Sequence, residues 1–285
     1  MNKVREFLRK WKRIYVKIAK KTVDLITSSL MNGPRIIQGS MVFLLENIDN
    51  TYKVKTPRGY LKISVSNGLE KWRADTLLTK EPETISWLEK TLTPHSVFYD
   101  VGANIGLYSL YAAHIFPKQV RIVSFEPESL NFARLNKNIY INNFSKQILP
   151  LSVALGKHSH LSEFLMSTFE AGRALHSERY VKRGQDVHRQ GCLIKNLDML
   201  IKEHSLLPFP THLKIDVDGP ELDILLGAIE TLKNVQLEHL LVEISEEERN
   251  RVLPIISQCG FHLVEEVAES PLGAEHNHIF VKKIL

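Results

Sequence analysis

The stretch VFYDVGANIG, residues 97–106, decides the fold of this chain. It begins as a short apolar run that ends in Asp100 and continues as a turn of small residues from Gly102 to Asn104. Gly102 lets the backbone bend sharply towards a ligand, and Asn104 adopts a left-handed conformation at lower cost than most residues. The apolar-periodic run 105–116 that follows predicts a helix. Strand, tight turn and helix form the first unit of a nucleotide-binding α/β sheet.

A carboxylate follows the next predicted strand. Residues 120–125 form a second apolar run, and Glu126 and Pro127 come directly after it. An acid at this point, roughly twenty residues after a glycine turn, accepts hydrogen bonds from both hydroxyls of a ribose. The chain is therefore predicted to hold an adenosine, either in a nicotinamide or flavin dinucleotide or in S-adenosylmethionine.

Charge distinguishes these two kinds of cofactor. A dinucleotide places a pyrophosphate over the glycine turn, where it favours a middle glycine and no nearby carboxylate. Here Asn104 takes the middle position and Asp100 precedes the turn, while two later predicted strands end in Asp216 with Asp218 and in Glu243. Carboxylates at strand ends repel a pyrophosphate and suit a ligand that carries an ammonium and a sulfonium. The pattern favours S-adenosylmethionine, with a dinucleotide-dependent oxidoreductase as the alternative.

The positive charge of the chain is concentrated in its N-terminal leader. The chain has 285 residues and a formal net charge of +5, and its length suffices for one large domain or a domain with an extension. Residues 1–22 contain nine Lys or Arg and one acid, whereas the remainder contains 28 Lys or Arg and 31 acids. A nucleic-acid binder spreads positive charge over its working face. No nucleic-acid partner is therefore predicted.

The leader itself has the pattern of an amphipathic helix. Apolar residues recur at helical spacing through residues 3–30, with Lys and Arg on the other face, and the sequence 32–34, NGP, ends the helix. No run of ~20 apolar residues predicts a membrane span, and no signal peptide is recognised. Two widely separated cysteines, Cys192 and Cys259, agree with a reducing compartment. We expect a cytoplasmic protein that contacts the inner face of a membrane peripherally through residues 1–30, or whose leader packs on the protein or a second subunit.

Three parts are predicted along the chain: a basic amphipathic helix (1–32), a β-hairpin and helix extension (33–92) and an S-adenosylmethionine-binding domain (93–285). Strands and helices alternate in the last part, which indicates an α/β fold with a doubly wound, mostly parallel sheet. The longest loop candidate, 167–192, is either a substrate lid or an excursion without fixed structure. The other predicted elements are strands at 51–55, 60–65, 147–155, 161–166, 213–219, 239–244, 261–267 and 278–283, and helices at 81–92, 129–141, 197–204, 220–233 and around Pro254.

Four motifs taken together resemble the FkbM-type methyltransferases. They are DVGANIG at 100–106, FEP at 125–127, KIDVDG at 214–219 followed by Glu221, and VEI at 242–244. The resemblance covers roughly residues 80–283. It implies a class I methyltransferase (Rossmann-like) sheet with an antiparallel last strand, S-adenosylmethionine as methyl donor, and O-methylation of sugars, glycolipids or polyketide-type natural products. The expected partner is accordingly a small-molecule or glycan acceptor. In this chain Asp stands at position 218, where the family usually has Glu, and residues 1–78 lie outside the core pattern.

Cofactor-binding residues are predicted at the turn and at the strand ends. Glu126 is expected to hold the ribose hydroxyls, and Asp100 to face the cofactor's ammonium directly or through a water. By analogy with the fold, the end of the third strand lies along the adenine edge. The full predicted set is Asp100, Gly102, Ala103, Asn104, Gly106, Glu126, Pro127, Ser152, Val153, Ala154 and Asp216.

Catalytic candidates come from charges on strands that are normally apolar. Lys214, Asp216 and Asp218 alternate and so project on one face of their strand, where a central parallel strand usually carries no charge. Either the acids orient or deprotonate the acceptor hydroxyl, or Lys214 and an acid form a structural ion pair. Glu243 could position the acceptor or contact a divalent cation such as Mg²⁺, for which no ligand set is predicted. His278 is a candidate general base. A third possibility is a non-catalytic adenosine-binding scaffold at a membrane, but such a binder needs no acids beyond those that hold the cofactor.

Overall fold

The computed structural model describes residues 17–18, 20–30, 32–34, 37–39, 50–166, 171–172, 188–217, 219–266 and 275–283. The chain divides into two compact units, Met1–Asn50 and Thr51–Leu285. Within the first unit, residues 20–30 are helical and mostly exposed. No helix of the described residues combines the length and the apolar composition that crossing a bilayer requires.

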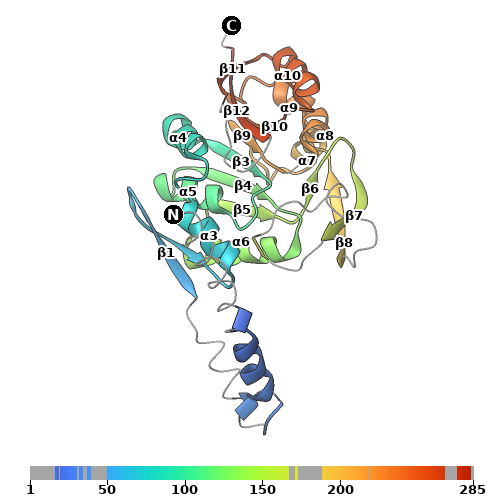
Figure 1. The fold of residues 1–285 in the computed structure, drawn as a ribbon. Coiled ribbons are helices and arrows are strands. Elements are labelled where there is room, and N and C mark those ends of the chain that lie inside the picture. Colours follow the sequence, from blue (N-terminus) through green and yellow to red (C-terminus); the bar gives the residue numbers. More distant parts are fainter. Residues whose placement is uncertain are drawn as a thin grey trace, which may run out of the picture. The chain divides into compact units, whose positions relative to one another are not determined.

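A seven-stranded sheet with the order β11-β12-β10-β9-β3-β4-β5 is the centre of the second unit (Figure 1). β12 runs antiparallel to its neighbours β10 and β11, and the other paired strands are parallel. This confirms the predicted class I methyltransferase arrangement of a mostly parallel sheet with an antiparallel last strand. The strands are β3 (Val97–Val101), β4 (Arg121–Phe125), β5 (Ile148–Leu151), β9 (His212–Ile215), β10 (His239–Ser245), β11 (Phe261–Glu266) and β12 (Glu275–Lys282).

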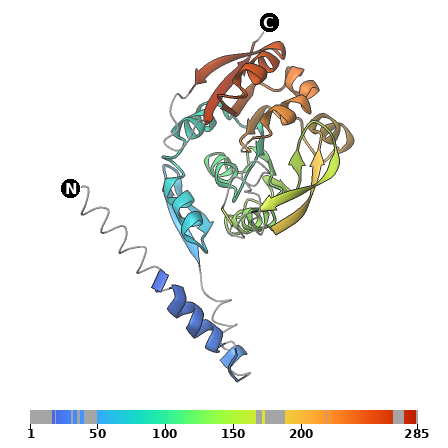
Figure 2. The ribbon, with the colours of Figure 1, turned by 45° about the vertical axis from the view of Figure 1, so that its right-hand side comes forward.

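Helices cover both faces of this sheet, and each face has its own apolar core (Figures 1 and 2). Along β3 the side chains alternate, so Phe98 lies in one core and Tyr99 in the other, and both are fully buried. Burial on both faces explains why the parallel strands read as continuous apolar runs. One face carries α3 (Gly68–Thr76), α4 (Pro82–Thr91), α5 (Leu107–Ile115) and α6 (Ser129–Ile141); the other carries α7 (Leu197–Glu203), α8 (Glu221–Leu226), α9 (Ile229–Lys233) and α10 (Arg249–Gln258).

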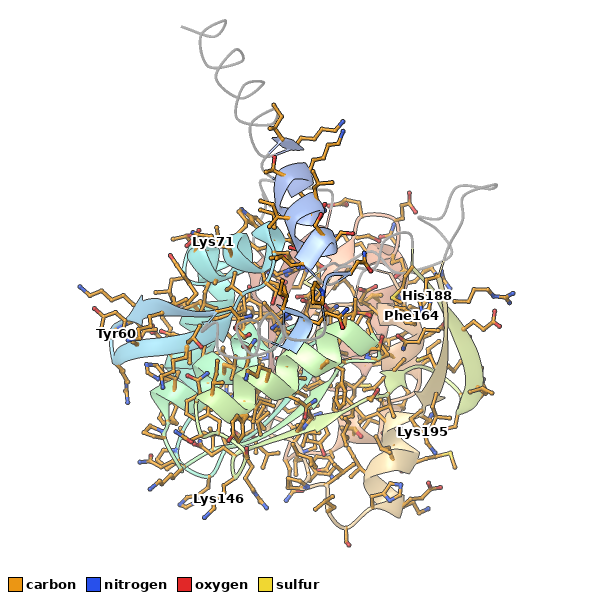
Figure 3. All side chains as sticks on the ribbon, turned by 90° about the horizontal axis from the view of Figure 1, so that it is seen from below. Tyr60, Lys71, Lys146, Phe164, His188 and Lys195 are labelled. Carbon is orange, nitrogen blue, oxygen red and sulfur yellow. The ribbon has the colours of Figure 1, made fainter. Side chains whose placement is uncertain are left out.

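The predicted hairpin is present as β1 (Thr51–Thr56) and β2 (Gly59–Ser64). Its inward side chains Leu61 and Ile63 are fully buried, and the amide of Ser64 donates to Asn138 Oδ1 on α6 at 2.8 Å. The hairpin therefore packs on the sheet domain, while Tyr60 on its other side is exposed (Figure 3).

Helix α3 is not predicted by the sequence patterns above. It begins with a capping box, in which Asn67 accepts from the amides of Leu69 and Glu70, and Glu70 accepts from the amide of Asn67. This Asn-x-x-Glu spacing is the signal that could have revealed the helix.

The predicted third strand, 147–155, is wrong as a single element. β5 ends at Leu151, and β6 (Ala154–Leu155) belongs to a separate three-stranded sheet with β7 (His160–Met166) and β8 (His188–Lys195). Pro150 lies in β5, which is an edge strand, as expected of a residue that lacks an amide donor. The end of the predicted loop 167–192 is also strand, because β8 begins at His188; most of that loop lies outside the described residues.

Candidate functional site

A cavity of about 100 Å³ lies at the carboxyl end of the central strands. Three parts of the chain form its walls: α3 with the residues that follow it, the glycine turn (residues 102–106) with the start of α5, and the ends of β9 and β10. Ligands of open α/β sheets bind at this edge. The lining residues are Arg73, Thr76, Leu77, Lys80, Glu81, Gly102, Ala103, Asn104, Ile105, Leu107, Tyr108, Asp216 and Glu243.

Every backbone amide of the glycine turn donates a hydrogen bond inside the protein. A pyrophosphate over this turn would need free amides there, so the geometry disfavours the dinucleotide alternative. The bonds run from Gly102 and Ala103 to Phe125 O (both 3.0 Å), from Asn104 to Glu126 Oε2 (2.7 Å), from Ile105 to Asn104 Oδ1 (2.9 Å) and from Gly106 to Ala103 O (2.8 Å).

Both glycines of the turn are required by the protein's own packing. Gly102 has φ +83°, and a Cβ there would lie 1.8 Å from the carbonyl oxygen of Asp216. Gly106 has φ +91°, and a Cβ there would lie 2.4 Å from Leu135 Cδ1 on α6. Gly102 therefore lets the chain leaving β9 cross close to the turn, which brings Asp216 to the cavity.

Glu126 is buried directly beneath the turn. Its Oε2 accepts from the amide of Asn104 at 2.7 Å and its Oε1 from the amide of Glu128 at 2.8 Å. Burial raises the pKa of Glu126 to about 8, although both amides favour the ionised form. Each carboxylate oxygen can accept a second hydrogen bond, so the group retains the acceptor capacity that two ribose hydroxyls require.

A buried lysine lies between two strand-end acids. Lys214 Nζ donates to Asp216 Oδ2 at 2.6 Å and lies 4.0 Å from Asp100 Oδ1. Asp100 Oδ2 in turn accepts from Ser109 Oγ at 2.6 Å. Burial alone would lower the pKa of Lys214, but the carboxylates of Asp216 and Asp100 outweigh it and raise the pKa above its usual value. The lysine therefore remains charged and fixes Asp216.

Asp216 and Glu243 leave adjacent parallel strands side by side, because Val242 pairs with Ile215 in register. Burial opposes ionisation of Asp216, but the charge of Lys214 and hydrogen bonds from Glu243 and Lys214 lower the pKa of Asp216 below its usual range. A group of such low pKa is a weak general base at neutral pH. Asp216 is therefore suited to hold a cation, and the neighbouring Glu243 to orient a hydroxyl.

Further lining residues were not singled out by the sequence patterns, and one of them, Tyr108, lies beside the Lys214–Asp216 pair, with 4.9 Å between Lys214 Nζ and the centre of its ring. Glu81 is buried, forms an ion pair with Lys80 and receives a hydrogen bond from Tyr108. Burial and the Glu81 carboxylate raise the pKa of Tyr108 well above its usual value, so its hydroxyl stays protonated. Arg73 on α3 also lines the cavity.

The predicted site residues divide into those that line the cavity and those that do not. Gly102, Ala103, Asn104, Asp216 and Glu243 line it. The predicted residues outside the lining are Asp100, Gly106, Glu126, Pro127, Ser152, Val153, Ala154 and Lys214. Asp218 lies outside the described residues.

His278 does not line the cavity. It is buried on β12 opposite Val242, with 3.2 Å between its Nε2 and Arg249 Nη1.

Glu221 of the third motif accepts from the amide of Gly219 at 2.9 Å, and burial raises the pKa of Glu221 to about 7. Glu221 thus fixes the backbone just beyond the end of β9. Among the described residues, no group of three or more His, Cys, Asp or Glu side chains is arranged to hold a metal ion.

The family model described as Methyltransferase FkbM domain matches residues 100–263, which is more than half of the chain. Methyltransferase sdnD of Sordaria araneosa is 27% identical over 196 residues, covering 60% of this chain and 75% of that protein. Hexuronic acid methyltransferase AglP of Haloferax volcanii is 29% identical over 186 residues, covering 64% of this chain and 70% of that protein. The solved structure of methyltransferase FkbM from Methylobacillus flagellatus aligns with a TM-score of 0.45 and 16% identity, covering 76% of this chain and 56% of that chain.

Proposed function

Because the chain belongs to the FkbM methyltransferase family, we propose that it transfers the methyl group of S-adenosylmethionine to a hydroxyl of a saccharide, glycolipid or similar natural product. The observation that carries this proposal is the pair Asp216 and Glu243, two carboxyl groups that line the same cavity as the glycine turn. A sugar acceptor is supported by the relative AglP, which is named for a hexuronic acid.

The described residues fit this cofactor. Glu126 has acceptor capacity for a ribose, the acids at the strand ends suit an ammonium, and the turn offers no free amide to a phosphate. S-adenosylmethionine would supply an electrophilic methyl on a sulfonium: the acceptor oxygen would form the new C–O bond as the S–C bond breaks, the hydroxyl proton would pass to water, and S-adenosylhomocysteine would remain.

The chain's own residues supply alignment and charge. Asp216, held ionised by Lys214, binds the cofactor's ammonium, and Glu243 beside it orients the acceptor hydroxyl. Little acid–base power is required when the electrophile is already cationic, and alignment of donor and acceptor contributes most of the rate. Asp218 is proposed to act with Glu243 at the acceptor, as the motif at 214–219 predicts.

The test separates binding from transfer. Glu243→Gln keeps the shape of the side chain and a hydrogen-bond donor for Asp216, so affinity for S-adenosylhomocysteine measured by calorimetry should change by less than about threefold. Transfer of labelled methyl to a panel of uronic acid and neutral sugar acceptors should fall by about 10² or more, because the acceptor hydroxyl loses the carboxyl group that orients it. Glu163→Gln is the matched control, because Glu163 is exposed and pairs with Arg189 on the accessory sheet. Tight binding of NADH in place of S-adenosylhomocysteine would favour the oxidoreductase instead.

A further part of the proposal concerns where the enzyme acts. Ile18, Leu25 and Ile26 recur at helical spacing and are 61%, 69% and 53% exposed. Lys17, Lys20 and Lys21 surround them, within a leader of nine cations and one acid. Exposed apolar groups with adjacent cations support peripheral binding to an anionic membrane surface at its cytoplasmic side, where each cation contributes ~1 kcal/mol.

Vesicle sedimentation of the full chain tests this part. Anionic vesicles should retain the protein at low salt and release it at high salt, and the triple variant Lys17→Glu, Lys20→Glu, Lys21→Glu should not bind. A triple charge reversal on the body, Lys53→Glu, Lys55→Glu, Lys62→Glu, is the control. Equal loss in both triple variants, or no retention of the parent protein, rejects a specific role of the helix.

A further inference from the structure

The cations that line the cavity differ in how they are paired. Lys80 forms an ion pair with Glu81, and Lys214 behind the lining pairs with Asp216. Arg73 is different: its Nε donates to the carbonyl oxygen of Gly172 at 2.5 Å, and within the described part of the chain it has no carboxylate partner. A guanidinium held at Nε by a backbone carbonyl still presents both Nη groups. Arg73 thus brings an unpaired positive charge to the wall of a partly enclosed site.

Arg73 is also held in place from two sides. The capping box of α3 fixes the start of its helix, where buried Glu70 accepts from Arg134 Nε on α6 at 2.6 Å. Its partner Gly172 is fixed in turn, since the Gly172 amide donates to Asn131 Oδ1 on α6 at 2.6 Å. A side chain supported in this way is pre-organised for a ligand and loses little freedom on binding.

The charges across the cavity match one kind of ligand. Asp216 and Glu243 lie at the strand ends, whereas Arg73 belongs to the wall formed by α3. An α-amino acid carries its ammonium and its carboxylate on the same carbon. An ammonium held at Asp216 therefore directs the carboxylate to another wall, and a planar guanidinium is the side chain best matched to a carboxylate.

We propose that Arg73 binds the carboxylate of the cofactor's methionine part through its two Nη groups. This inference rests on the proposed function, because it assigns a ligand within the same site. Helix α3 lies outside residues 100–263, the segment that the family model matches. The methionine end of the cofactor is thus closed by the extension that precedes the sheet, and this extension is part of the cofactor site.

Three ligands separate the contribution of the carboxylate to binding from that of the rest of the cofactor. S-adenosylhomocysteine carries it, decarboxylated S-adenosylhomocysteine lacks only that group, and methylthioadenosine lacks the whole amino-acid end. Calorimetry on the full chain should show that Arg73→Met weakens S-adenosylhomocysteine by about 10- to 100-fold, as expected for a lost charge-assisted hydrogen-bonded pair. Affinity for the two ligands without a carboxylate should change by less than about twofold, and Arg73→Lys should fall between the parent and Arg73→Met for S-adenosylhomocysteine.

Lys71→Met is the matched control, since Lys71 lies on the same helix, is half exposed and pairs with Asp75 (Figure 3). It removes one positive charge from α3 and should leave all three affinities unchanged. If Arg73→Met does not fold, Arg73→Gln is measured with the same three ligands.

Two results would overturn the assignment. Equal weakening of all three ligands would make Arg73 a support of the fold. Unchanged binding of S-adenosylhomocysteine, with a raised KM for the acceptor, would assign Arg73 to the acceptor. These failures differ from failure of the proposed function, in which the parent protein itself does not bind S-adenosylhomocysteine.

Discussion

Both ends of β9 bury an ionisable side chain, but only the side chain near the carboxyl end keeps its charge. Near its carboxyl end, Lys214 is 1% exposed and keeps its charge beside Asp216. Near its amino end, His212 is also 1% exposed, and its ring stacks on His239 of β10 with 4.6 Å between centroids. Two residues apart on one strand, the same loss of water has opposite consequences for the charged form.

The difference lies in the partners. Burial, together with a further contribution from the nearby His239, lowers the pKa of His212 to about 3, so the ring is neutral at physiological pH. Burial acts on Lys214 in the same direction, but two carboxylates reverse its effect. Acids gather where parallel strands end and ligands bind, whereas the amino ends pack against α4, where Trp87 contacts His212. On β9, the buried side chain that keeps its charge is therefore the one at the ligand-binding edge of the sheet.

The largest effect on stability is expected from removing the buried cation near the carboxyl end of β9. Lys214→Met should lower the free energy of unfolding by about 3–5 kcal/mol, because it leaves buried Asp100 and partly buried Asp216 without their cation. Urea denaturation followed by circular dichroism measures this loss. Lys71→Met is the control, because it removes the cation of an exposed ion pair, and it should leave the urea midpoint unchanged. If Lys214→Met is as stable as Lys71→Met, the ion pair does not hold this end of the sheet.

A smaller, pH-dependent effect on stability is expected near the amino end of β9, where His212 is neutral. The folded pKa of His212 lies below its unfolded value, so its contribution is present above the unfolded pKa of 6.5 and is lost as pH falls towards 3. Between pH 7 and pH 5 the loss should be about 2 kcal/mol. Urea denaturation at several pH values should show that the free energy of unfolding falls less steeply below pH 7 in His212→Phe, which retains an aromatic ring but cannot titrate. A parallel acid limb in both proteins would contradict the assignment.

Much of the fold could be predicted from local sequence. The run at 97–106, the acid at Glu126 and the alternation of strands and helices predicted the mostly parallel sheet, because these patterns are local and follow burial on both faces. The antiparallel last strand was implied by the resemblance to the FkbM-type methyltransferases. The division at Leu151 was missed, since the pairing of Ala154 with Ile194 depends on a partner about forty residues away. Helix α3 was missed because its signal is a cap and not an apolar stripe.

The site could be predicted only in part. Carboxylates at strand ends are visible in sequence, and Asp216 and Glu243 both line the cavity. Arg73 could not be found, because nothing local shows that α3 would lie against the glycine turn. The stacking of His212 on His239 likewise depends on the register of β9 with β10. Residues that act through contacts between distant elements thus require the fold itself.

The smallest effect is expected at Glu126, and it concerns ligand affinity. Glu126 is a buried acid just after the carboxyl end of β4, and the groups that donate hydrogen bonds to it are backbone amides, whereas Asp216 is paired with a cation. The pKa of Glu126, raised to about 8 by burial, leaves much of the group protonated at pH 7. Ribose hydroxyls donate best to the ionised carboxylate, so binding should favour loss of the proton. Affinity should therefore rise as pH rises through 8 and then level off.

Methylthioadenosine is the ligand of choice for this measurement, because it carries the ribose but no ammonium that would titrate in the same range. Calorimetry should show about tenfold tighter binding at pH 9 than at pH 7 for the parent protein. Glu126→Gln should bind more weakly and show no dependence on pH, and the control Glu163→Gln should follow the parent. A flat profile in the parent would mean that Glu126 has the same ionisation state in the free protein and in the complex between pH 7 and pH 9, which would contradict the coupling of ribose binding to loss of its proton. A slope that persists in Glu126→Gln would assign the titration to another group and remove Glu126 from the ribose site.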